Sequence, residues 1–350
     1  MDLSGAAWAM VSEAMLALGR LDQAGRQVPN PSLLRRPTLR REAQSTSALE
    51  GTYAPLTEVL EADLEDEPPR SPEVAEIINY VRAAEHAFAW AAERPITTGL
   101  LLDLHRLLVR GTPGDGPEAG RIRTHQVVIG PPATRVADAR FVPPPPGLEL
   151  DHAVHDWVSW TNSDHAGMSP VVTAALAHYQ FETLHPFNDG NGRIGRLLIV
   201  VQFMRYGVLR EPILTVSPWF ERHRREYQDE LQRVSEAGDF SRWATFFAEA
   251  ISAQADSTAS KVDRLLSFQE ETRARVRREG LRGVSVDISE RLIAQPVVTP
   301  TWAAKDFDVT YQAANNAIRR LVELGVLREV TGGRYRRVFA AEEAIRILES

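Results

Sequence analysis

Apolar residues recur at the three- and four-residue spacing of an α-helix along most of this 350-residue chain, and this periodicity restricts the folds it can adopt. Each such helix has one apolar face, so the helices must pack against one another around a shared core. The sequence therefore predicts a mainly α-helical protein. The clearest stretches are residues 72–93, 97–109, 171–184, 192–206, 220–234 and 243–254.

One segment, at residues 121–146, departs from the helical pattern. Its two parts, THQVVIG and RFVPPPP, carry β-branched residues and prolines on either side of a turn region. Strand-forming residues that flank turn residues indicate a short β-hairpin, which here leads into an extended proline segment.

The residues after about position 257 have a different character. A long charged helical stretch precedes the segments SERLIAQPVVT and TWAAKDFDVTYQAANNAIRRLVELGVL, and REVTGGRYRRVFA follows with Gly-Gly at its tip. Helix, helix-turn-helix and hairpin form the order of a winged helix. We therefore expect three regions, at residues 1–110, 111–255 and 256–350.

Composition excludes several classes of protein. The sequence has no cysteine, so disulfides, thiolate metal sites and a cysteine nucleophile are excluded. No apolar run approaches the roughly 18 residues of a membrane span, and the N-terminus lacks the basic region of a signal peptide, so we expect a cytoplasmic protein. The net charge of −7 argues against non-specific coating of nucleic acid, because that affinity comes from neutralising phosphates.

The segment LHPFNDGNGRIGRLL, residues 184–198, combines a small turn with a helix start. Gly190, Asn191 and Gly192 have little bulk between them, so their amides can point together into one concavity. The turn opens onto a helix expected to begin near Arg193, whose free N–H groups attract an anion. This segment therefore predicts a phosphate-binding site.

The neighbouring side chains supply the other groups that phosphoryl or nucleotidyl transfer requires. Arg193 and Arg196 are three residues apart in the first turn of the helix and can hold phosphate oxygens together. Asp189 offers a hard oxygen ligand for a magnesium ion that bridges phosphates. His185 can accept a proton near neutral pH and is the candidate base for an attacking hydroxyl.

Residues 185–196, HPFNDGNGRIGR, match every fixed position of the pattern His-Pro-Phe-x-Asp/Glu-Gly-Asn-Gly-Arg-x-x-Arg. With this segment the chain resembles the Fic (Fido) family of protein adenylyltransferases. The resemblance implies a Fic-type helical bundle with a small β-hairpin flap at about residues 121–146, and a C-terminal winged-helix domain. It also implies transfer of AMP from ATP to a Ser, Thr or Tyr hydroxyl of a target protein, with release of pyrophosphate.

The same resemblance assigns roles to the residues of the segment. His185 is the implied catalytic base, Asp189 holds Mg²⁺, and Phe187 anchors the loop by burial. An anion hole and a clamp for the β- and γ-phosphates make up the ATP site. Its implied members are Gly190, Asn191, Gly192, Arg193, Ile194, Gly195 and Arg196.

Two further segments are similar to parts of Fic proteins. Val127, Val128 and Ile129 lie in the hairpin, which resembles the flap that pairs with an extended target segment by strand addition. Residues 220–234 look like the helix that closes the adenine pocket. Tyr227 is the candidate adenine contact there, and a helix aromatic packed in the core is the alternative for the same residue.

An upstream segment matches a second motif of the family. Thr46, Glu50 and Gly51 fit the pattern Ser/Thr-x-x-x-Glu-Gly/Asn of autoinhibited Fic proteins, on a helix expected at about residues 37–51. Pro37 suits its start, and Gly51 suits the position just beyond its end. The resemblance implies that Glu50 pairs with Arg196 and prevents ATP from binding with its γ-phosphate in the productive pose.

Other functions stay open at this stage. His152, His155 and Asp156 prompt an HD-type metal phosphohydrolase, although the remaining ligands of such a site are not evident. Related Fic enzymes phosphorylate, transfer phosphocholine or remove AMP. The target protein is a separate protein or the chain itself, and a homodimer is a further alternative.

The winged helix suggests a DNA-binding transcriptional regulator with a Fic core as its sensor. Between residues 310 and 340, six Arg stand against two Glu, an excess that suits phosphate contacts but equally suits a solvated or protein-docking face. The candidate recognition helix spans about 311–324, and residues 335–337 lie on the expected wing. Its candidate DNA contacts are Asn315, Asn316, Arg319 and Arg320.

Overall fold

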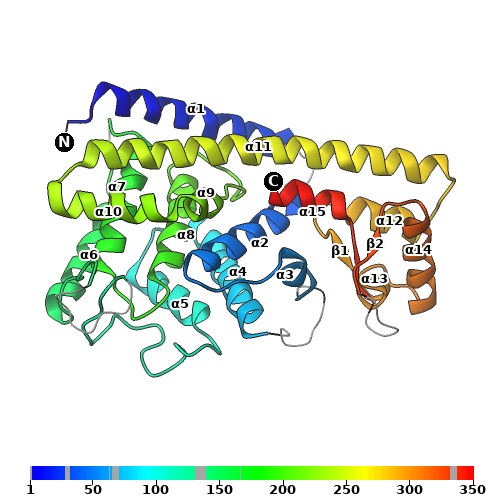
Figure 1. Ribbon diagram of the computed structural model, residues 1–350, viewed down its shortest axis with the longest axis horizontal. Helices are drawn as coiled ribbons and strands as arrows, with labels where there is room; N and C mark the ends of the chain where they lie inside the picture. The colour runs from blue at the N-terminus through cyan, green and yellow to red at the C-terminus, as the bar shows by residue number, and fades with distance from the viewer. Residues whose placement is uncertain are drawn as a thin grey trace.

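The computed structural model describes residues 2–27, 32–62, 64, 71–130, 139–165, 167–331 and 337–350. The described residues are mainly helical (Figure 1), which confirms the predicted fold class. The helices of the first 240 residues are α1 (Gly5–Gln27), α2 (Ser32–Leu49), α3 (Leu56–Ala62), α4 (Pro72–Ala91), α5 (Thr98–Leu108), α6 (Leu148–Thr161), α7 (Pro170–Leu184), α8 (Asn191–Arg205), α9 (Ser217–Arg222) and α10 (Arg224–Ala237).

The longest element is α11 (Phe240–Arg278), and α1 lies along its first half (Figure 1). Asp239 caps the N-terminus of α11 by accepting from the Arg242 amide at 3.1 Å, and three arginines in its last turn suit the negative end of the helix dipole. Arg20 of α1 holds Asp256 of α11 through two hydrogen bonds of 2.9 Å. A single helix therefore runs across the expected region boundary at residues 255 and 256.

The core of the helical bundle lies around the buried His178 of α7. The rings of Phe220, Tyr227, Trp243 and Phe247 surround its imidazole with centroids 5.9 to 6.3 Å away. The Trp243 indole donates to the Ala175 carbonyl at 2.8 Å, so its one polar group is satisfied inside the core. This cluster fixes α7, α9, α10 and α11 relative to one another.

Helix α2 starts earlier than the sequence predicts. It begins at Ser32, so Pro37 lies inside it and does not mark its start. A proline removes only one backbone hydrogen bond, and the fully buried Leu34 anchors the preceding turn. At the other end, Gly51 has φ +97°, and the Thr52 amide donates to the Ser47 carbonyl at 3.0 Å. The predicted place of Gly51, just past the helix, is confirmed.

The flap region carries less regular structure than a hairpin of two strands. Ile129 and Phe141 form one antiparallel bridge, with N···O distances of 2.9 and 3.1 Å. Residues 131–138, where the turn was expected, lie outside the described residues.

The C-terminal region has the predicted winged-helix order. It contains α12 (Val284–Arg291), β1 (Val297–Val298), α13 (Pro300–Asp306), α14 (Tyr311–Glu323), β2 (Arg328–Glu329), β3 (Phe339–Ala340) and α15 (Glu342–Glu349). The strands pair antiparallel in the order β1-β3-β2, with Val298 opposite Phe339 and Arg328 opposite Ala340. Of the expected wing residues, Tyr335 and Arg336 lie outside the described residues, whereas Arg337 pairs with Glu329 at 2.6 Å.

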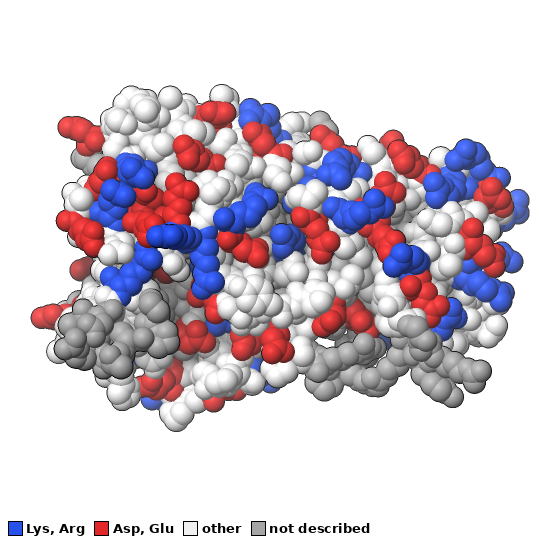
Figure 2. All heavy atoms as spheres, viewed as in Figure 1, with Lys and Arg blue, Asp and Glu red and all other residues white. Residues whose placement is uncertain are grey.

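Acidic and basic side chains are interspersed over the face of the molecule seen in Figure 2. Among the described residues, none of the helices combines the length and the apolar character needed to cross a bilayer.

We expect Trp243→Ala to lower the free energy of unfolding by about 3–5 kcal/mol, because it empties a fully buried aromatic site. Urea unfolding followed by far-ultraviolet circular dichroism measures the change. Trp8→Ala is the matched control, since Trp8 is 43% exposed, and it should change the free energy by less than about 1 kcal/mol. Equal losses in the two variants would show that the aromatic cluster does not stabilise the bundle.

Candidate active site

The segment between α7 and α8 reverses the chain through two left-handed residues. His185 ends α7 with φ +47°, and Gly190 precedes α8 with φ +79°. A Cβ atom at Gly190 would lie 2.6 Å from Leu108 Cδ2, so only glycine fits. Helix α8 begins at Asn191 and not near Arg193 as expected, so Asn191 and Gly192 belong to its first turn.

Asn191 fixes the shape of this loop. Its side chain accepts from the Phe187 amide at 2.8 Å and donates to the Phe187 carbonyl at 2.7 Å. The Phe187 ring is buried and stacks on His105, with centroids 4.2 Å apart and planes within 5°. The burial expected for Phe187 is therefore observed. The two hydrogen bonds of the Asn191 side chain to Phe187 stabilise the loop.

The N-terminus of α8 holds a carboxylate. A Cβ atom at Gly192 would lie 2.3 Å from Glu50 Oε1, so the Glu50 carboxylate rests directly against the first turn of the helix. The first-turn amides of a helix have no intrahelical acceptor and favour an anion. Glu50 thus lies beside the first turn of α8, where the helix geometry favours an anion.

Arg196 contacts both residues of the upstream motif. Its Nη2 donates to Glu50 Oε1 at 2.6 Å and to the Thr46 carbonyl at 3.1 Å, and its Nε donates to Thr46 Oγ1 at 2.8 Å. Burial alone would lower the pKa of this guanidinium, but the charge of Glu50 beside it raises the pKa above its ordinary value. The implied pairing of Glu50 with Arg196 is present in the structure.

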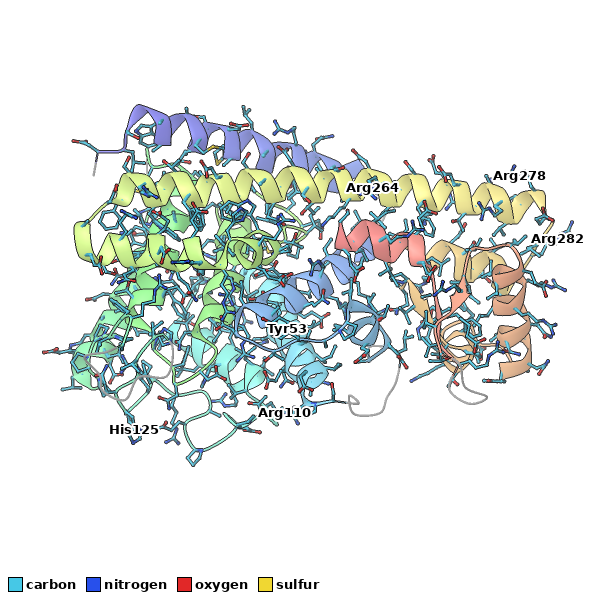
Figure 3. The ribbon with its side chains drawn as sticks, in the orientation of Figure 1. Tyr53, Arg110, His125, Arg264, Arg278 and Arg282 are labelled. Carbon is cyan, nitrogen blue, oxygen red and sulfur yellow. The ribbon has the colours of Figure 1, made fainter. Side chains whose placement is uncertain are left out.

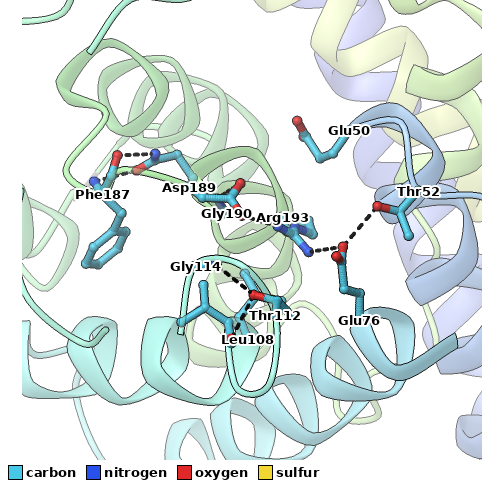
Figure 4. Close-up of polar contacts among 12 residues, drawn as sticks. Glu50, Thr52, Glu76, Leu108, Thr112, Gly114, Phe187, Asp189, Gly190 and Arg193 are labelled. Atoms are coloured by element: carbon cyan, nitrogen blue, oxygen red, sulfur yellow. Dashed lines mark hydrogen bonds and ion pairs between the residues drawn. The ribbon is translucent and has the colours of Figure 1, made fainter. Parts of the chain in front are cut away.

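Arg193 lies on a second chain of polar contacts, which Figure 4 shows. Its guanidinium is 3.1 Å from Asp189 Oδ2 and 3.5 Å from Glu76 Oε2, and Thr52 donates to that Glu76 oxygen at 2.9 Å. Sequence analysis did not identify Glu76, which lies near the N-terminal end of α4. Each motif arginine therefore faces a carboxylate from the N-terminal helices.

Asp189 has the features of a ligand that shares a metal with a substrate. Its side chain is 55% exposed and accepts from the Gly190 amide at 2.6 Å. Within the described ranges, no group of three or more His, Asp or Glu side chains could hold a metal by itself. A magnesium ion at Asp189 would need phosphate oxygens for its other positions, and Mg²⁺ bound with nucleotides uses this kind of ligand set.

His185 is held as a neutral base. Burial lowers its imidazole pKa to about 4. Its carbonyl accepts from Arg123 Nε at 2.8 Å, and the same buried guanidinium donates to carbonyls of Leu184, His125 and the flap residue Pro144. Arg123 therefore joins the base of the flap to the loop, a role that nothing in its local sequence indicates.

A cavity of about 520 Å³ lies between the loop, the flap and α10. His185, Gly192, Arg196 and Glu50 line one side. The opposite side consists of Ile129, Gly130, Arg140 and Phe141 from the flap, and of Arg224, Tyr227, Gln228, Leu231, Gln232 and Ser235 from α10 and its start. An ion pair between Arg140 and Asp229 ties the flap to α10.

Several expected site residues lie away from this cavity. Ile194 is buried in the core, and Gly195 packs on α7, where an added Cβ would lie 2.2 Å from Glu182 Oε1. Neither residue lines the cavity, because the helical period turns both towards the interior, and their contact with ATP stays a prediction. Val127 and Val128 belong to the flap but do not line the cavity.

Tyr227 and Glu182 meet at the inner end of the cavity. The Tyr227 ring lines the wall, but its hydroxyl is 2.7 Å from His178 Nε2, inside the core. Burial raises the carboxyl pKa of Glu182 to about 7. Sequence analysis missed Glu182, which lies in the last turn of α7, three residues before His185.

The residues that prompted a metal phosphohydrolase do not form a site. His152, His155 and Asp156 lie exposed on α6. The described residues that surround them provide no metal-binding group. A solvated helix face explains these three side chains.

Sequence profiles of known families match three parts of the chain. The Fic/DOC family N-terminal profile matches residues 8–89, and the Fic/DOC family profile matches residues 95–203, so together they cover more than half of the chain. A profile described as an HTH DNA binding domain matches residues 287–337.

Two protein adenylyltransferases are similar in sequence to part of this chain. A protein adenylyltransferase Fic of Aedes aegypti is 36% identical over 155 residues, which is 44% of this chain and 27% of that protein. Protein adenylyltransferase fic-1 of Caenorhabditis elegans is 39% identical over 108 residues, which is 31% of this chain and 19% of that protein. The chain thus matches less than a third of either relative's length.

Solved structures show the same fold. A Fic family protein from Desulfovibrio desulfuricans G20 superposes with a TM-score of 0.61 at 21% identity, over 97% of each chain. Residues 134 to 508 of Fic-1 from C. elegans superpose with a TM-score of 0.55 at 24% identity, over 74% of this chain and 73% of that one.

We expect Asn191→Ala to lower the free energy of unfolding by about 1–3 kcal/mol, because it leaves both backbone groups of Phe187 without partners in a buried loop. Hydrogen exchange should report the same loss locally, as faster exchange of the Phe187 amide. Asn188→Ala, in the exposed part of the same loop, is the control and should leave that amide protected. Unchanged protection in Asn191→Ala would refute the bridging role.

Proposed function

Because the chain belongs to the Fic/DOC family, we propose that it is a protein adenylyltransferase that transfers AMP from ATP to a Ser, Thr or Tyr hydroxyl of a target protein. One observation carries the proposal: a neutral histidine, the N-terminus of α8 and Arg196 all face one cavity. Relatives that share 36% and 39% identity with parts of this chain are named protein adenylyltransferases.

The reaction needs one proton transfer and one displacement at phosphorus. His185 takes the proton of the target hydroxyl, and the hydroxyl oxygen forms a bond to the α-phosphorus. The bond between this phosphorus and the oxygen that bridges to the β-phosphate breaks, and pyrophosphate leaves with that electron pair. No covalent intermediate with the enzyme is required.

The protein contributes mainly position and charge. The first-turn amides of α8 and the guanidinium of Arg196 stabilise the charge that develops on the leaving pyrophosphate. Asp189 is the side chain that would hold Mg²⁺, and this ion supplies further positive charge to the phosphates when it is bound. Arg123 holds the backbone of His185 and the flap together through its hydrogen bonds, so that the base stays opposite the bound hydroxyl.

The flap fits the docking of an extended target segment. Ile129 uses its own backbone groups to pair with Phe141, which leaves the other edge of residues 127–129 open to a second strand. Val128 exposes 40% of its surface at this edge, and Val127 and Ile129 are partly exposed beside it. Backbone pairing there would bring a target hydroxyl over the cavity.

Glu50 acts as the inhibitor in this proposal. Its carboxylate lies where the helix N-terminus would receive a phosphate, and it neutralises Arg196, so ATP must displace it to bind productively. The exchange replaces one anion by another, and for that reason loss of Glu50 should change activity more than stability.

A second proposal concerns DNA. Helix α14, in the part of the chain that matches a DNA-binding profile, exposes Tyr311, Arg319 and Arg320 to solvent. We propose that this helix contacts phosphates and base edges in a DNA groove. A DNA mobility shift that weakens with salt and persists in His185→Ala supports the contact, and a shift that needs His185 argues against it.

We expect Glu50→Gly to increase self-labelling or lysate labelling by ATP at least about tenfold, because Arg196 and the α8 amides become free to bind phosphate. Label on the α-phosphate should stay with protein, whereas label on the γ-phosphate should not. Glu58→Gly, an exposed helix position, is the control for backbone effects and should label like the unmodified protein. Transfer of the γ-label would replace the proposed reaction by phosphorylation, and His185→Ala in the Glu50→Gly background should abolish labelling.

As the pH falls from about 8 to about 5, protonation of His185 should not lower the labelling rate of Glu50→Gly. Burial already lowers this imidazole pKa to about 4, and loss of the Glu50 charge, which raises it, should lower it further. Glu182 has its carboxyl pKa raised to about 7, so the profile is measured again in Glu50→Gly/Glu182→Gln. A fall in rate centred at the ordinary histidine value of 6.5 in this double variant would contradict the neutral, buried base.

A further inference from the structure

A buried lysine lies on the inner face of α11, away from the nucleotide cavity. Lys261 exposes only 7% of its surface. It continues a polar stripe of Gln254 and Thr258, whose side chains are each 3.2 Å from Thr215 Oγ1. A buried ammonium group is expensive unless an opposite charge compensates it.

Three guanidinium groups act on Lys261. Burial lowers its pKa to about 8, and the next causes are the nearby guanidinium groups of Arg41, Arg222 and Arg264. These groups come from α2, from the end of α9 and from α11 itself. Among the residues that the structure describes, none of the four cations forms an ion pair with Asp or Glu. We call Arg41, Arg222, Lys261 and Arg264 the α11 basic cluster.

The arginines of the α11 basic cluster contact only neutral groups. Arg41 Nη1 donates to Gln44 and Ser45 at 2.8 Å, while its buried Nε has no hydrogen-bond partner. The Gln254 side-chain amide is oriented so that its nitrogen donates to Thr215. Its oxygen then accepts from Arg222 Nη2 at 3.2 Å.

The fourth member lies at the outer edge of the cluster. Arg264 donates to Ser350 Oγ at 2.9 Å, and Figure 3 labels it on α11 beside α15. By contrast, Asp256 on the same helix is paired with Arg20. Of the four cations only Lys261 is buried, so the countercharge is missing where burial makes it matter most.

We infer that the α11 basic cluster is a binding site for a small anion that carries a phosphate or pyrophosphate group. Four cations from three helices can surround such an anion, and arginine forks together with an ammonium group are the side chains that bind phosphate oxygens. The anion supplies the countercharge that the protein lacks. None of the four residues lines the nucleotide cavity, so this site is separate from the active site.

The position of the site on α2 gives it a consequence for activity. Nine residues separate Arg41 from Glu50, and at about 100° per residue they lie on opposite sides of the helix. An anion that bridges Arg41 to α9 and α11 would hold α2, and with it Glu50, against the active site. This consequence rests on the proposed function, whereas the anion site does not.

The test uses the two lysines of the sequence, Lys261 and Lys305. Labelling with [ε-¹³C]lysine gives one carbon signal for each, and titration of these signals with pH yields both pKa values. Sodium phosphate and sodium pyrophosphate are added against sodium chloride at equal ionic strength. We expect the pKa of Lys261 to rise from about 8 towards its ordinary 10.5, by at least about one unit, while Lys305 on the exposed side of α13 does not respond.

Variants separate this site from the active site. Arg222→Gln and Arg41→Gln should each abolish the response of the Lys261 pKa to phosphate. The double variant Glu50→Gly/Arg41→Gln should still transfer label from ATP to protein. A phosphate response without any labelling would sink the proposed function and leave the anion site standing. No shift of Lys261 at about 20 mM phosphate or pyrophosphate, or equal shifts of both lysines, would overturn the anion site.

Melting temperatures give an independent readout. Phosphate should raise the melting temperature of the full chain, and Lys261→Met should remove this increase and raise the melting temperature in chloride alone, because it removes an unpaired buried charge. If Lys261→Met instead lowers the melting temperature in chloride and phosphate has no effect on either protein, the lysine is structural and the site does not exist.

Discussion

The contact between the Glu50 carboxylate, Arg196 and the first turn of α8 is the interaction on which the arrangement of the site depends. Arg196 is 2% exposed, and a guanidinium in such a place needs an anion and further hydrogen-bond acceptors. Glu50 supplies the charge, and the Thr46 hydroxyl and carbonyl supply the acceptors. Helix α2 is therefore packed against α8 by these groups, and in the proposed function the same position on α8 and Arg196 would receive a phosphate.

This arrangement explains why an all-helical bundle suits the site. The ends of helices provide what binds a phosphate, and α7 and α8 bring one such end next to a histidine through a turn of two left-handed residues. The turn keeps its shape without any ligand, because Asn191 closes it and Phe187 packs beneath it on His105. The carboxylates of Glu50 and Glu76, which face Arg196 and Arg193, come from the end of α2 and from α4, so the N-terminal helices contribute a countercharge to each of the two cations.

The sequence predicts the helical elements well where the apolar period is strong and less well where packing decides. The expected helices at residues 72–93, 97–109 and 171–184 agree with α4, α5 and α7 within two residues. The expected helix at 220–234 is instead divided at His223 into α9 and α10. Here the histidine side chain lies 2.9 Å from the Trp219 carbonyl and stacks on that indole, contacts that periodicity cannot reveal. Likewise, α2 continues through Pro37 because burial of its first turn outweighs one missing hydrogen bond.

The sequence by itself determined the fold class, the order of the three regions and the short segment that carries His185, Asp189 and the two arginines. Those conclusions depend on local spacing, which the chain keeps in any context. Only the tertiary structure decided which distant groups meet there: Glu76 with Arg193, Arg123 with the backbone of the flap and the loop, and Arg41 with Lys261. These groups lie on segments whose relative placement is set by the packing of a common core, and no local pattern records the outcome of that packing.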